Sequence, residues 1–184
     1  MIFFYLLVLL VWLVISVTIV LFITAQIIAV FTTDAPFVPI PDGVEYAIVD
    51  ALGLQNGSVL YDLGCGDARV LRTAMEKYGG VRAVGIEIGF FPYLLARFKS
   101  RKYKNIKIKR EDIFRTDVSD ATHIFLYLYP QVMEKLMPIL EKKCRKGTRI
   151  VSCDFQDKNR VPDATIPLPQ NNNKRGKNLF VYIL

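Results

Sequence analysis

Two glycines, Gly64 and Gly66, lie in the segment Asp62-Leu63-Gly64-Cys65-Gly66-Asp67-Ala68-Arg69. This segment begins where the short apolar run at residues 58–62 ends. Gly64 and Gly66 let the backbone approach a ligand closely and turn sharply into the start of a helix. A dinucleotide fingerprint would have a third glycine where Arg69 stands, and a P-loop would have Gly-Lys-Ser/Thr. Because Asp62 ends the preceding strand, the loop suits a ligand with a positive amino group better than one with a pyrophosphate.

Acids also follow the next two predicted strands. Gly85-Ile86-Glu87 ends the second strand, and a carboxylate there can accept hydrogen bonds from both hydroxyls of a ribose. Glu111-Asp112-Ile113-Phe114 follows the third strand, where an acid can bond an adenine amine while an apolar side chain covers the ring. Each acid alone also fits an ordinary solvated loop. Three acids at successive strand ends together predict an adenosine-containing ligand.

The chain must hold these loops on a regular framework, and short apolar runs alternate with amphipathic segments throughout it. Strands are expected at residues 58–62, 82–87, 106–109, 123–128, 148–154, 164–168 and 178–184, and helices at 43–52, 68–78, 92–102 and 131–143. This alternation predicts an α/β fold with a doubly wound sheet and right-handed crossovers, closed by an antiparallel pair of strands joined by the polar tract Gln170–Lys177. Ligands bind such sheets at the carboxyl ends of the strands, where the three acids lie.

With these motifs in place, the sequence resembles the class I S-adenosylmethionine-dependent methyltransferases over about residues 37–184. The resemblance implies a Rossmann-like, seven-stranded sheet and S-adenosylmethionine as the cofactor. It also implies roles for the motif residues. Asp62, Gly64 and Gly66, with Cys65 between them, would contact the methionine end of the cofactor, Glu87 and Ile88 the ribose, and Asp112 and Ile113 the adenine.

More narrowly, the chain resembles the single-span protein-lysine methyltransferases of the mitochondrial inner membrane and their prokaryotic relatives, which modify the ATP synthase c subunit or the adenine nucleotide translocase. The match lies in an apolar N-terminus, the strip Thr33-Asp34-Ala35-Pro36-Phe37-Val38-Pro39, the segment Tyr127-Leu128-Tyr129-Pro130 and the later Ser152-Cys153-Asp154-Phe155. It implies a lysine of a membrane-associated protein as the acceptor.

Tyr127, Tyr129 and Pro130 are the candidate catalytic residues, because they follow the fourth strand, where an acceptor would meet the sulfonium methyl group. Aromatic walls disfavour the ammonium form of a lysine and can hold its cation before transfer. We expect the two tyrosines to alternate faces, so that at most one lines the site; the alternative is that both are core aromatics. The Asn/Asp-Pro-Pro-Tyr/Phe motif of enzymes that methylate exocyclic base nitrogens is absent. His123, the only histidine, begins this strand and is expected to be structural.

The first 33 residues carry no charge, whereas all 24 Lys and Arg and all 17 Asp and Glu lie beyond them. Ile2–Ile23 is an apolar run broken only by Ser16 and Thr18, and as a helix it reaches about 33 Å, enough to cross a hydrocarbon core of about 30 Å. A cleaved signal peptide is the alternative, but it would have a basic start and an apolar core of roughly 7–15 residues. We therefore predict a transmembrane anchor over residues 1–31 and exclude a polytopic membrane protein.

Residues 32–41 form a predicted proline-rich linker, and residues 42–184 the methyltransferase domain. Asp42 with Glu45 predicts a capping box at the start of the first helix of the domain. The first basic residue is Arg69, after the span, so the positive-inside rule predicts a single-pass protein with its domain on the cytoplasmic side, or the matrix side of a mitochondrion.

Eight Lys and Arg fall within Arg97–Arg110, which is either a solvated surface or a site for anionic lipid. Nucleic acid is disfavoured as a partner, since few aromatic residues interleave the charges. The three cysteines fit neither a disulfide framework nor a zinc site, and no metal is expected. Three functions stay open: a membrane protein-lysine methyltransferase, a methyltransferase for a lipid, quinone or other small membrane-soluble molecule, and a nucleotide-binding module without activity. The lack of an inserted lid favours the first.

Overall fold

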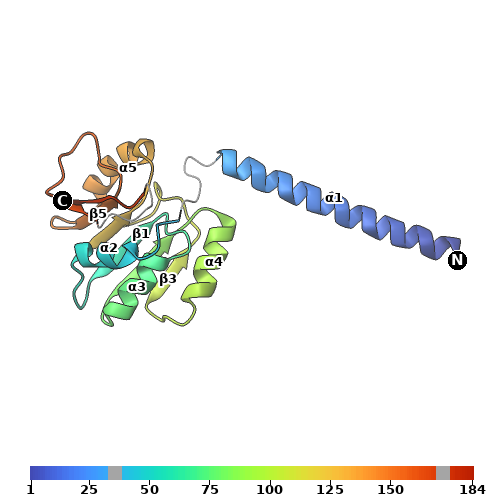
Figure 1. Ribbon diagram of the computed structural model, residues 1–184, viewed down its shortest axis with the longest axis horizontal. Coiled ribbons are helices and arrows are strands. Elements are labelled where there is room, and N and C mark those ends of the chain that lie inside the picture. Colours follow the sequence, from blue (N-terminus) through green and yellow to red (C-terminus); the bar gives the residue numbers. More distant parts are fainter. Residues whose placement is uncertain (33–38, 169–174) are drawn as a thin grey trace. The chain divides into compact units, whose positions relative to one another are not determined.

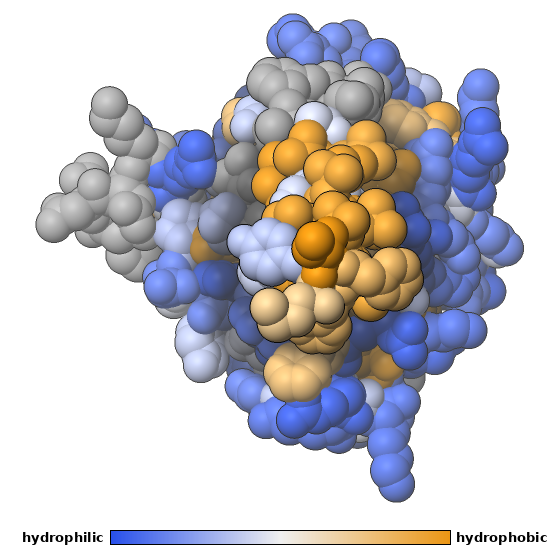
Figure 2. Space-filling model, turned by 90° about the vertical axis from the view of Figure 1, so that its right-hand side faces the viewer, coloured by the Kyte–Doolittle hydropathy of each residue, from blue (hydrophilic) through white to orange (hydrophobic). Residues whose placement is uncertain are grey.

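The N-terminal unit of the chain, Met1–Pro36, contains one long helix, α1 (Ile2–Thr32) (Figure 1). In the computed structural model, residues 1–32, 39–168 and 175–184 are described, and within them Ile2–Ala25 is the one helical segment whose length and composition would allow it to cross a membrane. Its apolar side chains are exposed and stand out in orange in Figure 2. The hydroxyls of Ser16 and Thr18 donate to the carbonyls of Trp12 and Val14, so these polar groups are satisfied within the helix.

The second unit, Phe37–Leu184, is built on a seven-stranded sheet of order β3-β2-β1-β4-β5-β7-β6. Its strands are β1 (Val59–Leu63), β2 (Arg82–Ile86), β3 (Ile106–Lys109), β4 (His123–Leu126), β5 (Arg149–Cys153), β6 (Ala164–Pro167) and β7 (Asn178–Ile183). The first five are parallel, and β7 pairs antiparallel with both β5 and β6. The predicted doubly wound α/β fold with an antiparallel C-terminal strand pair is confirmed.

Helices cover both faces of this sheet. They are α2 (Val44–Leu52), α3 (Arg69–Lys77), α4 (Phe90–Ser100) and α5 (Pro130–Lys143). One hydrophobic cluster joins apolar residues of α2 and α3, with Ala96 of α4, to alternate strand residues such as Leu60, Phe125 and Val151. Ser152, which points the other way, contacts Met133 of α5. Because side chains alternate along a strand, β1, β2, β4 and β5 supply apolar residues to two cores, whereas β3 supplies only Ile106 and Ile108 to the first.

Most predicted boundaries lie within two residues of the observed ones, but the capping box at Asp42 and Glu45 is wrong. Helix α2 follows Gly43, whose φ of 87° places it in the left-handed region, and no side-chain cap bond forms there. The Asp42 carboxylate instead accepts a bond of 2.7 Å from Arg69, 27 residues later. A tertiary ion pair has therefore taken the side chain that local sequence assigned to the helix start.

Part of two predictions lies outside the described residues. Residues 33–38 belong to the predicted linker, and residues 169–174 to the predicted loop between the last two strands. On either side of the second gap, the N–H of Leu168 donates to the carbonyl of Lys177 at 2.8 Å, which extends the β6–β7 pairing.

Candidate active site

The loop between β1 and α3 folds back onto the end of β2. The N–H groups of Gly64 and Cys65 both donate to the carbonyl of Ile86, at 2.8 and 2.9 Å. Gly64 has a φ of +86°, and a Cβ there would lie 3.1 Å from Leu128, so both conformation and space call for glycine. This turn lies between β1 and β4, where the strand order reverses and sheets of this kind bind their ligands.

A pocket opens over this turn at the ends of β1 and β4. It is lined by Pro39, Ile40, Asp62, Gly64, Cys65, Gly66, Asp67, Arg69, Val70, Phe125 and Tyr127. Asp62, at 3% exposure, is the deeply buried acid of the pocket. Burial, together with the charges of Glu87 and Asp67, raises the pKa of the Asp62 carboxyl well above its ordinary value. A cationic group in the pocket would offset that penalty, as the predicted amino-group contact requires.

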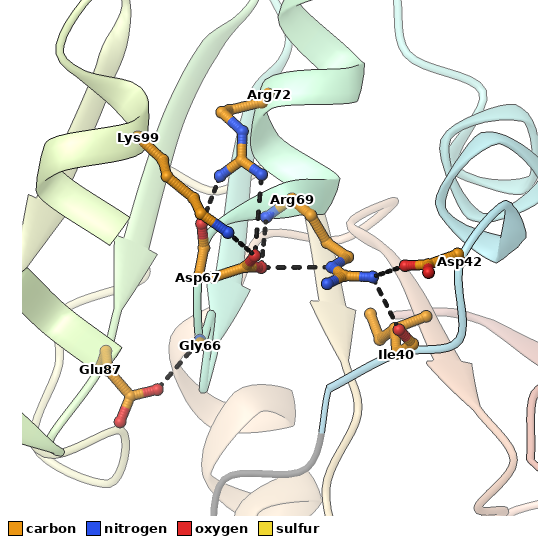
Figure 3. A network of polar contacts seen from close by, with 8 residues as sticks. All are labelled: Ile40, Asp42, Gly66, Asp67, Arg69, Arg72, Glu87 and Lys99. Atoms are coloured by element: carbon orange, nitrogen blue, oxygen red, sulfur yellow. Dashed lines mark hydrogen bonds and ion pairs between the residues drawn. The ribbon is translucent and has the colours of Figure 1, made fainter. Parts of the chain in front are cut away.

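Glu87 lies just beyond β2 and ties three segments together. Its carboxylate accepts a bond from the N–H of Gly66 at 3.0 Å (Figure 3). It also accepts a bond from the N–H of Gly89 at 2.8 Å. Burial raises the pKa of Glu87, although these backbone bonds act in the opposite direction. The acid is therefore held rigidly beside the glycine loop, in a position that suits a ligand running from Asp62 toward β2.

Asp67 is the centre of an ion-pair network that the sequence did not reveal. Its carboxylate accepts a bond of 2.7 Å from Lys99 and one of 3.3 Å from Arg69, while Arg72 lies 3.8 Å away (Figure 3). Burial alone would raise the pKa of Asp67, but the bonds from Lys99 and Arg69 outweigh it and lower the pKa. Arg69 also donates to the carbonyl of Ile40 at 2.9 Å, which fixes the segment before α2 against the pocket.

The predicted adenine residues lie farther along the same sheet edge. Asp112 follows β3, and its carboxylate accepts the N–H of Phe114 at 2.9 Å. Ile113 is half-buried, whereas Ile88 is 51% exposed. None of the three lines the pocket over the glycine turn. Their contact with a cofactor stays a prediction.

The two tyrosines after β4 share one aromatic partner. The ring centroids of Tyr127 and Tyr129 lie 6.1 and 5.9 Å from that of Phe155, which follows β5. The expectation that the tyrosines point to different faces is wrong, because residues two apart on an extended chain share a face. Tyr129 directly precedes α5, whose first residue is Pro130. Of the two tyrosines, Tyr127 lines the pocket over the glycine turn. Burial, reinforced by Asp154, raises the pKa of Tyr127 to about 12, so the phenol stays neutral.

Phe155 is held in place by bonds that sequence reasoning did not assign. The hydroxyl of Ser152 donates to the carbonyl of Phe155 at 2.7 Å. Asp154, with a φ of 63°, accepts the N–H groups of Gly176 and Lys177 at 2.6 and 2.7 Å. The sequence does show that aromatic residues follow both the fourth and the fifth predicted strands. If these strands are neighbours in the sheet, their aromatic segments lie side by side.

His123, Cys144 and Cys153 are not among the residues that line the pocket, whereas Cys65 is. His123 begins β4, at the end opposite the pocket, and burial lowers its pKa. Burial likewise raises the pKa of Cys65, Cys144 and Cys153, and the three thiols are free. Among the described residues, no cluster of three or more His, Cys, Asp or Glu could hold a metal ion.

Comparisons with known proteins agree with this geometry. The ANTKMT methyltransferase domain family matches residues 62–164. A protein-lysine N-methyltransferase of Saccharolobus islandicus is 31% identical over 82% of this chain and 96% of its own length. The human lysine N-methyltransferase of the ATP synthase c subunit is 28% identical over 70% of this chain, which spans 55% of that protein.

A solved structure is also closely similar. The RNA methyltransferase from Salinibacter ruber, in complex with S-adenosyl-L-homocysteine, has a TM-score of 0.73 and 34% identity, over 79% of this chain and 93% of that one. A Geobacter sulfurreducens methyltransferase with the same ligand, at 18% identity and a TM-score of 0.55, shares the fold. The buried Asp62 and the glycine turn suit the cationic methionine end of such a cofactor. The chain is thus an S-adenosylmethionine-dependent methyltransferase and belongs to the ANTKMT methyltransferase domain family.

Proposed function

We propose that this chain N-methylates a lysine of a membrane-associated protein. The observation that carries the proposal is the similarity to a protein-lysine N-methyltransferase along 96% of that relative's length. Because this similarity spans almost the whole relative, it includes the region around the pocket. The lysine methyltransferases of the ATP synthase c subunit support the same substrate class over a shorter part of their length.

The pocket residues, and Glu87 which accepts a bond from Gly66 beside them, suit the cofactor in distinct ways. Asp62 would bind the amino group of the methionine part of the cofactor. The backbone at Gly64 and Gly66 would lie close to the cofactor, and Glu87 would accept hydrogen bonds from the ribose hydroxyls. When bound, S-adenosylmethionine supplies a methyl group activated by its positive sulfur for in-line displacement. The protein's part is to position donor and nucleophile, at about 3–3.5 Å from each other.

The aromatic cluster of Tyr127, Tyr129 and Phe155 suits a lysine as the nucleophile. A lysine ε-amine, with an ordinary pKa of about 10.4, must lose a proton before it can attack. Half-buried rings lower the stability of the ammonium form, and their faces can hold the side chain before that proton leaves. Since Tyr127 belongs both to this cluster and to the pocket lining, the cluster adjoins the place where a methyl donor would lie.

The apolar helix supports a membrane location. Residues 2–25 have the length and composition of a span, and every basic residue follows it. By the positive-inside rule the domain would then face the cytoplasm, or the matrix if the source is mitochondrial. Protease added to intact spheroplasts or mitoplasts should leave the domain intact, and digestion from outside would overturn this topology.

RNA is a second candidate acceptor, because the Salinibacter ruber structure at 34% identity is named an RNA methyltransferase. Three features favour protein. The segment after β4 reads Tyr127-Leu128-Tyr129-Pro130, without the motif typical of enzymes acting on exocyclic base amines. Few aromatics interleave the basic residues. The lysine methyltransferase relative is matched over a slightly larger share of its own length.

The deciding experiment uses the full chain in detergent with radiolabelled S-adenosylmethionine and a membrane extract that contains protein, lipid and RNA. Label should run with protein, and mass spectrometry should find a methylated lysine near the end of a membrane span. Label in lipid or quinone would move the assignment to a small membrane-soluble acceptor, and label in RNA would move it to the second candidate.

A matched pair of variants controls this experiment. Glu87→Ala removes the proposed ribose acceptor, which should weaken cofactor binding about tenfold or more, since bonds to a charged group contribute about 1.5–3 kcal/mol. Glu141→Ala removes a more exposed acid of α5 that does not line the pocket, and this variant should bind cofactor normally. Unchanged affinity for Glu87→Ala in calorimetry would contradict its role.

A further inference from the structure

Helix α4 presents its large apolar side chains outward. Its buried residues are the small Ala96 and Ser100. The exposed ones form what we call the α4 apolar face: Phe90, Phe91, Leu94, Leu95 and Phe98, at 41–64% exposure. An amphipathic helix of a soluble domain normally has the opposite arrangement, with large apolar residues inward.

The spacing of these residues makes the face continuous. Phe90, Leu94 and Phe98 follow one another at intervals of four, and Phe91 and Leu95 form the adjacent row. Side chains three or four residues apart lie on the same side of a helix. A contiguous apolar surface of this kind usually marks an interaction site, since a helix that faced only water would carry polar residues there.

Cations border the face and lie over its rings. The guanidinium of Arg101 is 4.1 Å from the centroid of Phe98, and that of Arg110 is 5.3 Å from the centroid of Phe90. Arg97 lies over Tyr93 at 5.7 Å and donates to its hydroxyl at 3.1 Å. Stacked in this way, each cation keeps its charge directed outward beside an apolar ring.

These border cations form no ion pair with an acid that the structure describes. In the described part of the chain, Lys99 and Lys109 pair with Asp67 and Glu111, but no carboxylate forms an ion pair with Arg97, Arg101, Lys102 or Arg110. An apolar face bordered by uncompensated positive charge complements one kind of surface above others: a bilayer interface whose headgroups are anionic.

We propose that the α4 apolar face inserts into the interface of an anionic bilayer, with Arg97, Arg101 and Arg110 on the lipid phosphates. The inference rests on the proposed membrane location, because α1 would bring a bilayer within reach. Only about a dozen residues separate Ala25 from Phe37, and even a fully extended chain of that length, at about 3.5 Å per residue, would reach no farther than about 40 Å. Anchor and face would then bind the same membrane.

Docking at this face would set the position of the active site. Helix α4 begins directly after Gly89, whose N–H donates to Glu87, and Arg110 donates to the carbonyl of Ile88 at 3.2 Å. Hydrogen bonds thus connect Glu87, the proposed ribose-binding residue, to the segment that leads into the α4 apolar face. A bilayer bound at α4 would hold the pocket close to the headgroups, where a lysine at the end of a membrane span lies.

Depth-dependent fluorescence quenching tests the proposal on the full chain. In a Trp12→Phe background, Phe98→Trp places the single tryptophan on the α4 apolar face. The matched control, Tyr46→Trp, places it on α2, where Tyr46 is similarly exposed at 59% against 64% for Phe98. Both proteins are reconstituted in phosphatidylcholine vesicles with about 30% phosphatidylglycerol, using lipids brominated near the glycerol end of their chains.

Strong quenching at position 98, with little at position 46, is expected. Adding Arg97→Ala and Arg101→Ala should lower the docking equilibrium constant by about fivefold for each charge removed. Equal quenching at the two positions overturns the proposal. So does shielding of position 98 from acrylamide that rises with protein concentration at a fixed ratio of detergent to protein, which would indicate a second copy of the chain on this face. Flotation of the vesicles reports the anchor separately, so a failed anchor and a failed docking face give different results.

Discussion

At the scale of single residues, we expect cofactor binding to be coupled to the release of a proton from the buried carboxyl of Asp62. Burial and the neighbouring acids raise the pKa of its carboxyl well above the ordinary value, so the cofactor-free protein holds this proton to a higher pH than a solvent-exposed aspartate does. Binding an amino group favours the charged carboxylate and should release that proton. We therefore expect cofactor affinity to rise with pH through the Asp62 pKa. Calorimetry in buffers of different ionisation enthalpy should detect the released proton, and a pH-independent affinity without proton release would contradict the contact.

The raised pKa of Asp62 also predicts whether its substitution raises or lowers the stability of the protein. A carboxyl whose pKa is raised by folding contributes stability below its ordinary pKa, and that contribution is lost as pH rises through the folded value. Asp62→Asn should therefore raise the Tm of the cofactor-free protein at pH 8 while weakening cofactor binding. Asp67 serves as the control. Its pKa is lowered by Lys99 and Arg69, so Asp67→Asn should lower the Tm at the same pH.

Substitution of Phe155 should lower activity toward the protein substrate without changing cofactor affinity. Phe155 contacts Tyr127 and Tyr129 but does not line the pocket over the glycine turn. We expect Phe155→Ala to reduce kcat/KM for the protein substrate about 3- to 30-fold, the equivalent of losing about 0.5–2 kcal/mol of cation–aromatic attraction. Phe155→Tyr should keep most of the activity. Steady-state kinetics beside cofactor calorimetry would check this, and an equal loss in cofactor affinity would place Phe155 in the cofactor site instead.

At the scale of elements, the close approach of β2 to the glycine loop depends on Gly85. A Cβ there would lie 2.8 Å from Cys65 Sγ, 2.8 Å from Ile108 and 2.9 Å from Leu71. Gly85→Ala should cost about 1–3 kcal/mol of stability by overpacking and should also displace the loop. Gly79→Ala, where nothing lies within 4 Å, is the matched control. Denaturant unfolding would measure both, and equal stabilities would show that the loop adapts freely.

Sequence periodicity was sufficient for the elements but not for the contacts between them. Strands β1, β2, β4 and β5 read as short apolar runs because both of their faces are buried, which is why the sequence predicts them within two residues. The ion-pair network of Asp67 depends on Lys99 from another helix, and the position of Phe155 depends on the neighbouring strand. Such pairings follow from strand order and side-chain packing, which local patterns do not contain.

At the scale of the whole molecule, the proposed anchor should control where the enzyme acts and not whether it can act. The described residues that line the pocket over the glycine turn all lie beyond residues 1–33. Deletion of residues 1–33 should leave activity on a detergent-solubilised substrate nearly intact while abolishing methylation in cells. Mass spectrometry of membrane proteins from cells with full or shortened enzyme would test this, and normal methylation by the shortened chain would remove the need for a membrane tether.

The position of β7 also has a consequence for the order of synthesis. This strand lies between β5 and β6, yet the ribosome makes it after both. Until it emerges, β5 presents an unpaired edge and β6 has no partner, while α1 has long since left the ribosome. With α1 as the proposed anchor, the nascent chain would therefore reach a bilayer before its sheet can close. We expect this exposed edge to be the stage of its biogenesis most prone to aggregation, and the one at which chaperones would bind it.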